Sequence, residues 1–86
     1  MTTPNSVRTD LTTLITGLYR QALADPAIGP DCDFFEAGGD SLAAFQITAG
    51  LQEELGVDVP VALVFSYPAP ADLAAAVEAD LAEGVR

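Results

Sequence analysis

The chain contains no histidine and no lysine, and its only cationic side chains are Arg8, Arg20 and Arg86. Histidine and lysine are the usual bases that activate a serine nucleophile, and the G-x-S-x-G turn of serine hydrolases is also missing. The single cysteine, Cys32, has no partner for an intrachain disulfide. We therefore expect no catalytic residue, no metal site and no enzymatic activity in this chain.

Positive charge is scarce. The chain has three arginines and 13 acidic residues, which gives a formal net charge of −10. Nucleic acids and anionic lipids are bound by clustered lysine and arginine, which this chain lacks. No stretch is long and apolar enough to cross a bilayer, and residues 1–6 do not resemble a signal peptide. These features predict a cytoplasmic protein with no nucleic-acid or membrane partner. Its acidity can serve docking to basic protein surfaces or merely solubility.

The 86 residues, half of them hydrophobic, fit one small domain. Apolar residues at helical spacing predict a first helix that starts at Thr9 or Asp10 and reaches about Leu23. Prolines and glycines then open a loop that runs to Gly39. A loop of this length is unusual in so small a domain, so it is a candidate for function.

A second helix should begin at Asp40 or Ser41 and end at Gly56, whose missing Cβ suits a left-handed cap. Pro60 and Pro70 suit the first turns of a short third helix and of a last helix. The fold class is therefore all-α, a small four-helix bundle with a long loop after the first helix and a short third helix. We expect a flexible tail over residues 1–8 and a single domain over residues 9–83.

The second helix has two apolar sides on a helical wheel. Five residues fall on one side and three on the other: Ala44, Ile47, Thr48, Leu51 and Leu55 against Leu42, Phe45 and Ala49. The first set can face the core while the second stays at least partly exposed as a docking patch for other proteins. The alternative is that Phe45 belongs to the core of the bundle.

The segment Gly38-Gly39-Asp40-Ser41 places one serine at the mouth of the second helix, after Phe34 and Phe35, which should hold the loop to the core. Two glycines followed by Asp-Ser are also typical of an ordinary turn before a capped helix. For Asp40 we favour this capping role over a transient role near a metal ion. Free N–H groups and the helix dipole would favour a phosphate attached to Ser41.

Two stretches carry a resemblance to a known family. Residues 31–42, with their acidic lead-in, paired phenylalanines and Gly-Gly-Asp-Ser-Leu motif, and residues 53–68 resemble the phosphopantetheine-dependent carrier proteins, in particular the peptidyl carrier proteins. This resemblance implies the acyl carrier type of helical bundle. It also implies that Ser41 receives 4′-phosphopantetheine from coenzyme A and that the arm carries an acyl group as a thioester.

The resemblance further implies the partners: a phosphopantetheinyl transferase, an acid-activating (adenylating) enzyme, and tailoring or condensing enzymes. We expect a freestanding (type II) monomer that serves nonribosomal peptide or hybrid natural-product synthesis. An acyl carrier protein of polyketide or fatty-acid synthesis, and a non-enzymatic acidic helical adaptor, are the alternatives. Gln46 and Gly50 stand where peptidyl carriers commonly have arginines, and Gly17 and Gly50 each cost a helix interior about 1 kcal/mol.

Overall fold

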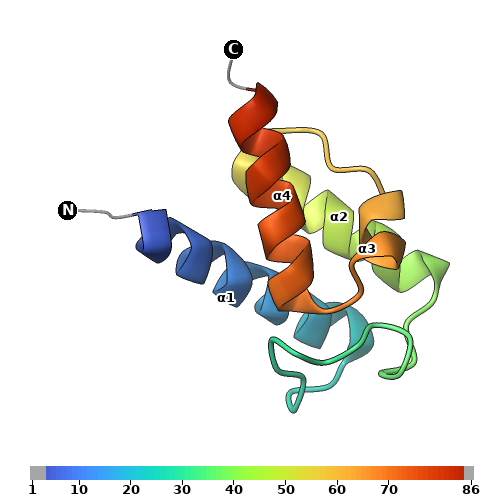
Figure 1. Cartoon of the computed structure of the whole chain (residues 1–86). Helices are drawn as coiled ribbons and strands as arrows, with labels where there is room; N and C mark the ends of the chain where they lie inside the picture. Colours follow the sequence, from blue (N-terminus) through green and yellow to red (C-terminus); the bar gives the residue numbers. More distant parts are fainter. Residues whose placement is uncertain (1–3, 85–86) are drawn as a thin grey trace.

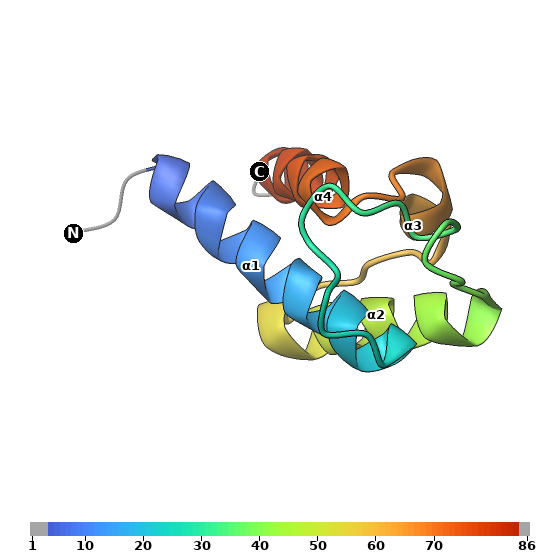
Figure 2. The ribbon, with the colours of Figure 1, turned by 90° about the horizontal axis from the view of Figure 1, so that it is seen from below.

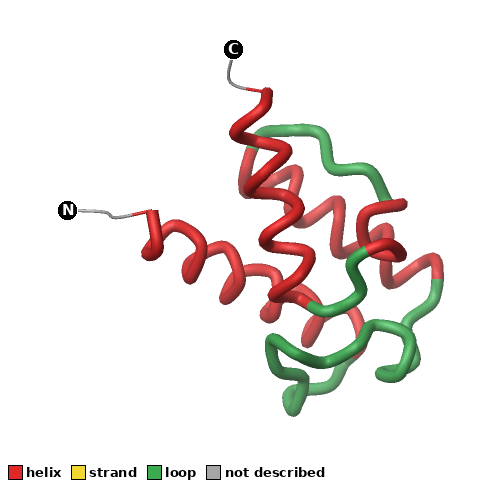
Figure 3. Tube along the Cα trace, in the orientation of Figure 1, coloured by secondary structure: helices red, strands yellow, loops and turns green. Residues whose placement is uncertain are grey.

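The computed structural model of the protein describes residues 4–84, which form four helices and no strand (Figure 1 and Figure 3). The helices are α1 (Pro4–Leu23), α2 (Ser41–Leu55), α3 (Ala62–Ser66) and α4 (Pro70–Gly84). The all-α class, the long loop between α1 and α2, and the short third helix are thus confirmed. None of the helices in this described part is long and apolar enough to span a membrane.

Two helix starts differ from the prediction. α1 begins at Pro4, not at Thr9 or Asp10, because a proline's fixed φ and missing N–H suit a first helical turn ahead of the apolar stripe. Residues 4–8, which we assigned to a flexible tail, thus have helical backbone, while the domain boundary at residue 9 stays a prediction. α3 begins at Ala62, because Pro60 opens a tighter turn in which its carbonyl accepts the Leu63 N–H at 3.1 Å.

The helices enclose one core. α1 packs against both α2 and α4, and α3 contacts the same two helices (Figure 1 and Figure 2). The two long helices α2 and α4 are therefore bridged by α1 and by α3. Every helix contributes to the buried apolar cluster: Leu11, Ile15, Tyr19, Ile28, Phe34, Ala43, Ala44, Ile47, Leu51, Val59, Val64, Leu73, Ala74 and Val77.

The backbone carbonyl of Pro68, in the link between α3 and α4, ties three segments together. It accepts the Tyr19 hydroxyl from α1 at 2.8 Å and the Phe34 N–H from the long loop at 3.0 Å. The Ala71 N–H, in the first turn of α4, also donates to the Pro30 carbonyl of this loop at 2.9 Å. The long loop is therefore held to the start of α4 at two points.

Tyr19 predicts how stability responds to alkaline pH. Its ring is fully buried, and burial raises the pKa of its hydroxyl well above 10, with a smaller contribution from the negative charge of Asp33. The folded state keeps this proton after the unfolded state has released it, so the free energy of unfolding should fall as pH rises above about 10. For one such group the slope is at most about 1.4 kcal/mol per pH unit.

The variant Tyr19→Phe should lose about 1 kcal/mol of unfolding free energy at pH 7, because the hydrogen bond to Pro68 is missing. Above pH 10 its stability should fall less steeply than that of the wild type. Urea denaturation of both proteins between pH 7 and pH 11 measures the two slopes. Equal slopes above pH 10 would assign the alkaline loss to other groups.

Candidate functional site

α2 begins at the end of the bundle where the long loop approaches α3 (Figure 2). Ser41 is the first residue of this helix and is exposed. Asp40 precedes it as the N-cap, with extended backbone. The Asp40 carboxylate accepts the Ala43 N–H at 2.9 Å, and its carbonyl accepts the Ala44 N–H at 3.0 Å. The capping role of Asp40 is thus confirmed. Among the side chains that the structure describes, no group of His, Cys, Asp or Glu could hold a metal ion.

The loop approaches Ser41 through a single capped turn. Asp33 starts this turn, because its carboxylate accepts the N–H groups of Phe35 at 2.8 Å and Glu36 at 3.1 Å. The turn ends as a helix does at its C-terminus: the Gly38 N–H donates to the Phe35 carbonyl, and the Gly39 N–H donates to the Phe34 carbonyl. Gly38 has a φ of 89°, a left-handed conformation that favours glycine.

Gly39 is required for a different reason, namely space. A Cβ on this residue would overlap the ring of Phe34, which is 0% exposed and packs edge-on against Tyr19. The ring therefore lies directly against the backbone that leads into α2. The loop-pinning role predicted for Phe34 is confirmed, and the same contact sets where Ser41 begins its helix.

The first turn of α2 keeps two N–H groups available. Asp40 satisfies the N–H groups of Ala43 and Ala44, whereas those of Ser41 and Leu42 have no partner within the described residues. With the positive end of the helix dipole, these two groups suit the oxygens of a phosphate on the Ser41 side chain. The residues present therefore fit a phosphodiester. They do not activate the serine, since the chain has no histidine or lysine to take its proton.

Beside Ser41 the predicted two sides of α2 are present. Leu42 is 65% and Phe45 62% exposed, and Ala49 is exposed as well. The opposite set is buried except for Leu55, which is partly buried: Ala44, Ile47, Thr48 and Leu51. The alternative that Phe45 belongs to the core is wrong. Leu42, Phe45 and Ala49 form an apolar patch that begins next to the serine.

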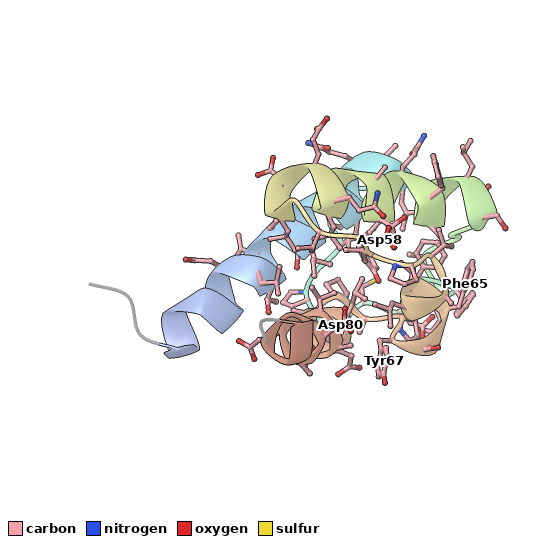
Figure 4. The ribbon with its side chains drawn as sticks, turned by 90° about the horizontal axis from the view of Figure 1, so that it is seen from above. Asp58, Phe65, Tyr67 and Asp80 are labelled. Carbon is pink, nitrogen blue, oxygen red and sulfur yellow. The ribbon has the colours of Figure 1, made fainter. Side chains whose placement is uncertain are left out.

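Phe35 differs from the prediction, because it is 52% exposed and does not enter the core. Consecutive residues of a helical turn point in different directions, so burying Phe34 turns Phe35 outward. Its ring stacks on Phe65 of α3, with centroids 5.9 Å apart and planes at 20°. Phe65 and Tyr67 are also exposed (Figure 4). Sequence reasoning missed these two, since the short apolar run around α3 has no period that shows which residue faces outward.

Replacing Gly38 or Gly39 with alanine should lower the free energy of unfolding by different amounts. Gly39→Ala should lower the free energy of unfolding by about 2–3 kcal/mol, because the buried Phe34 ring has no room to yield. Gly38→Ala should cost only about 1–2 kcal/mol, from the left-handed backbone. Gly29→Ala is the matched control, with open space at its Cβ, and should change stability by less than about 1 kcal/mol. Chemical denaturation gives the three values, and equal losses at residues 38 and 39 would contradict the packing argument.

Comparison with known proteins points to one family. The family model described as "Phosphopantetheine attachment site" matches residues 11–77. The chain is 40% identical over 63 residues to phosphinothricin tripeptide synthetase PhsB of Streptomyces viridochromogenes. That match covers 73% of this chain and 5% of PhsB, so the chain spans only a small part of this relative.

Two solved structures share the fold. BlmI, a type-II acyl-carrier-protein from Streptomyces verticillus involved in bleomycin biosynthesis, superimposes with a TM-score of 0.85 at 25% identity, over 90% of this chain and 93% of BlmI. A structure described as a nonribosomal PCP domain gives a TM-score of 0.68 at 30% identity, over 77% of this chain and 84% of that domain. The bundle is thus of the acyl carrier type, and the chain belongs to the phosphopantetheine attachment family of carrier proteins.

Proposed function

We propose that Ser41 is the attachment residue for 4′-phosphopantetheine. The observation that best supports this proposal is the position of Ser41. It is the exposed first residue of α2, and the N–H groups of Ser41 and Leu42 have no partner within the described residues. The family match over residues 11–77 includes this residue. When bound, the arm supplies a thiol that holds an acyl group as a thioester. The chain's own part is to present the hydroxyl and to orient the phosphate at the helix N-terminus.

In this proposal the protein carries an aminoacyl or other acyl group for nonribosomal peptide or hybrid natural-product synthesis and catalyses nothing itself. A base of a separate transferase must take the Ser41 proton, because this chain offers none of the usual ones. Tethering then gives each partner a high effective concentration of the acyl group. The relatives PhsB and the PCP domain favour a peptidyl carrier, and BlmI supports a separate carrier of type II.

The surface beside Ser41 indicates what its partners look like. Leu42 and Phe45 are exposed apolar side chains on the helix that the exposed Asp40 caps, and the loop before this helix carries the exposed Glu36. A complementary partner has an apolar pocket with a basic rim. We assign this role to the phosphopantetheinyl transferase, the adenylating enzyme and the tailoring or condensing enzymes, each of which meets a monomeric carrier in the cytoplasm.

An acyl carrier of polyketide or fatty-acid synthesis is the second candidate. BlmI is described as an acyl-carrier-protein, and α2 of this chain has two glutamates and no cation. Loading the modified protein with amino-acid-activating or with acyl-transferring enzymes separates the two candidates.

Attachment is tested by incubating the protein with coenzyme A, magnesium and a broad-specificity phosphopantetheinyl transferase. Intact mass should increase by one phosphopantetheine group in the wild type and not in Ser41→Ala. Ser66→Ala, which removes another exposed hydroxyl, should gain the group like the wild type. An unchanged wild-type mass would favour the adaptor alternative, and a gain in Ser41→Ala would move the site elsewhere.

Docking is tested with Phe45→Ser. Because the side chain is 62% exposed, the unfolding free energy should change by less than about 0.5 kcal/mol. The kcat/KM of the transferase for this variant should fall on the order of tenfold, the loss typical of an interface anchor. Val57→Ser, at the far end of α2, is the control and should load normally. A folded Phe45→Ser protein with unchanged kcat/KM would remove Phe45 from the docking surface.

A further inference from the structure

A groove of about 390 Å³ lies between α1 and α2. The two helices cross there (Figure 2), and each contributes one glycine to the lining, Gly17 from α1 and Gly50 from α2. Its volume falls within the range of about 300–1,000 Å³ that is usual for ligand pockets. The Ser41 site described above uses none of the residues that line it.

The two glycines have different structural consequences. A Cβ on Gly50 would lie 2.7 Å from Leu18 Cδ2, so the Leu18 side chain would have to shift to make room for it. A Cβ on Gly17 would meet nothing within 4 Å. Packing therefore does not require glycine at position 17, although glycine weakens a helix interior. What the missing side chain provides is open space in the groove.

The lining suits a side chain that is apolar along its stem and cationic at its tip. Leu14 and Leu18, both partly buried, supply the apolar part of the groove. The polar residues of the lining, which carry a hydroxyl, two amides and two carboxylates, are Thr13, Gln21, Gln46, Glu53 and Glu54. Arginine has this shape, and its planar guanidinium can donate several hydrogen bonds to carboxylate and amide oxygens at once.

None of the described side chains places a cation in this groove. Among the side chains that the structure describes, Arg20 is the one cation, and its Nε donates to the Ile28 carbonyl of the long loop at 2.7 Å. Arg20 is not part of the lining. With a formal net charge of −10, the chain needs the complementary charge from another molecule.

The groove lies on the side of α2 away from Ser41 and borders the apolar patch. At about 100° per residue, Gly50 is about 180° from Ser41 around the helix axis, whereas Gln46 is about 40° from Leu42 and Glu53 about 40° from Ala49. An arginine side chain in the groove would therefore leave Ser41 itself accessible.

We propose that the α1–α2 groove is a second docking site, which takes an arginine side chain of a partner protein. This docking site goes beyond the attachment function and does not depend on it, because neither Ser41 nor the phosphopantetheine arm takes part in binding at the groove. Arginine is enriched among the residues that anchor protein interfaces, whereas lysine is depleted, so the guanidinium is the favoured occupant.

The probe is N-acetyl-arginine N′-methylamide, added to the ¹⁵N-labelled, unmodified protein and followed by NMR. Saturable shifts at the amides of Gly17 and Gly50, with a millimolar dissociation constant, are expected. The lysine and norleucine analogues should bind at least threefold more weakly. Gly17→Leu, which fills the groove, should weaken binding at least tenfold without lowering the melting temperature. Glu53→Gln with Glu54→Gln should weaken it at least threefold, and Glu36→Gln, an exposed acid outside the groove, should not.

Several outcomes would overturn the proposal. Shifts that do not saturate, or that are as large around Glu36, would mean general attraction to an acidic surface. Equal binding of the lysine analogue would remove the arginine assignment. A marked drop in the melting temperature of Gly17→Leu would show that glycine is needed for packing after all. Because the unmodified protein is used, failure of the Ser41 mass test leaves each of these results interpretable.

Discussion

The position of the Phe34 ring is the constraint on which the rest of the structure depends. The ring is fully buried, contacts Tyr19 of α1 edge-on, and lies against Gly39 where a Cβ would overlap it. Its own N–H reaches the Pro68 carbonyl, which also accepts the Tyr19 hydroxyl. One residue, through its ring and its backbone N–H, thus joins the long loop to α1, to the link before α4 and to the start of α2. Ser41 stands two residues beyond this contact, so its place on the surface is set by packing in the core.

The scarcity of basic side chains distinguishes the steps that the protein can perform alone from those that need a partner. With no histidine or lysine, and with Arg20 donating to a backbone carbonyl, the described surface offers carboxylates and apolar side chains but no free base. In the proposed function, such a surface presents the attached group to basic partners and leaves proton transfer to them. The apolar patch beside Ser41 and the groove lined by Gly17 and Gly50 occupy neighbouring sides of α2, with Gly50 about 180° from Ser41 around the helix axis.

Local sequence signals predicted those features that depend on nearby residues. Asp40 caps α2 and Gly56 ends it with a φ of 68°, as their residue types indicated, because both effects act within one helical turn. The early start of α1 at Pro4 was missed, since the apolar stripe begins only at Leu11. Phe34 and Phe35 were both expected to hold the loop to the core, yet a helical turn points the two rings in different directions and only Phe34 is buried.

By itself the sequence determined the all-α class, the carrier family and the serine at the head of α2, because periodicity, caps and the Gly-Gly-Asp-Ser-Leu motif are written in consecutive residues. Only the tertiary structure decided that Gly39 is required by the ring of Phe34, and that Phe35 stacks on Phe65. It also decided that Gly17 and Gly50 line a groove between α1 and α2. These features join residues far apart in the chain, and their distances depend on how the helices cross and pack, which no local pattern encodes.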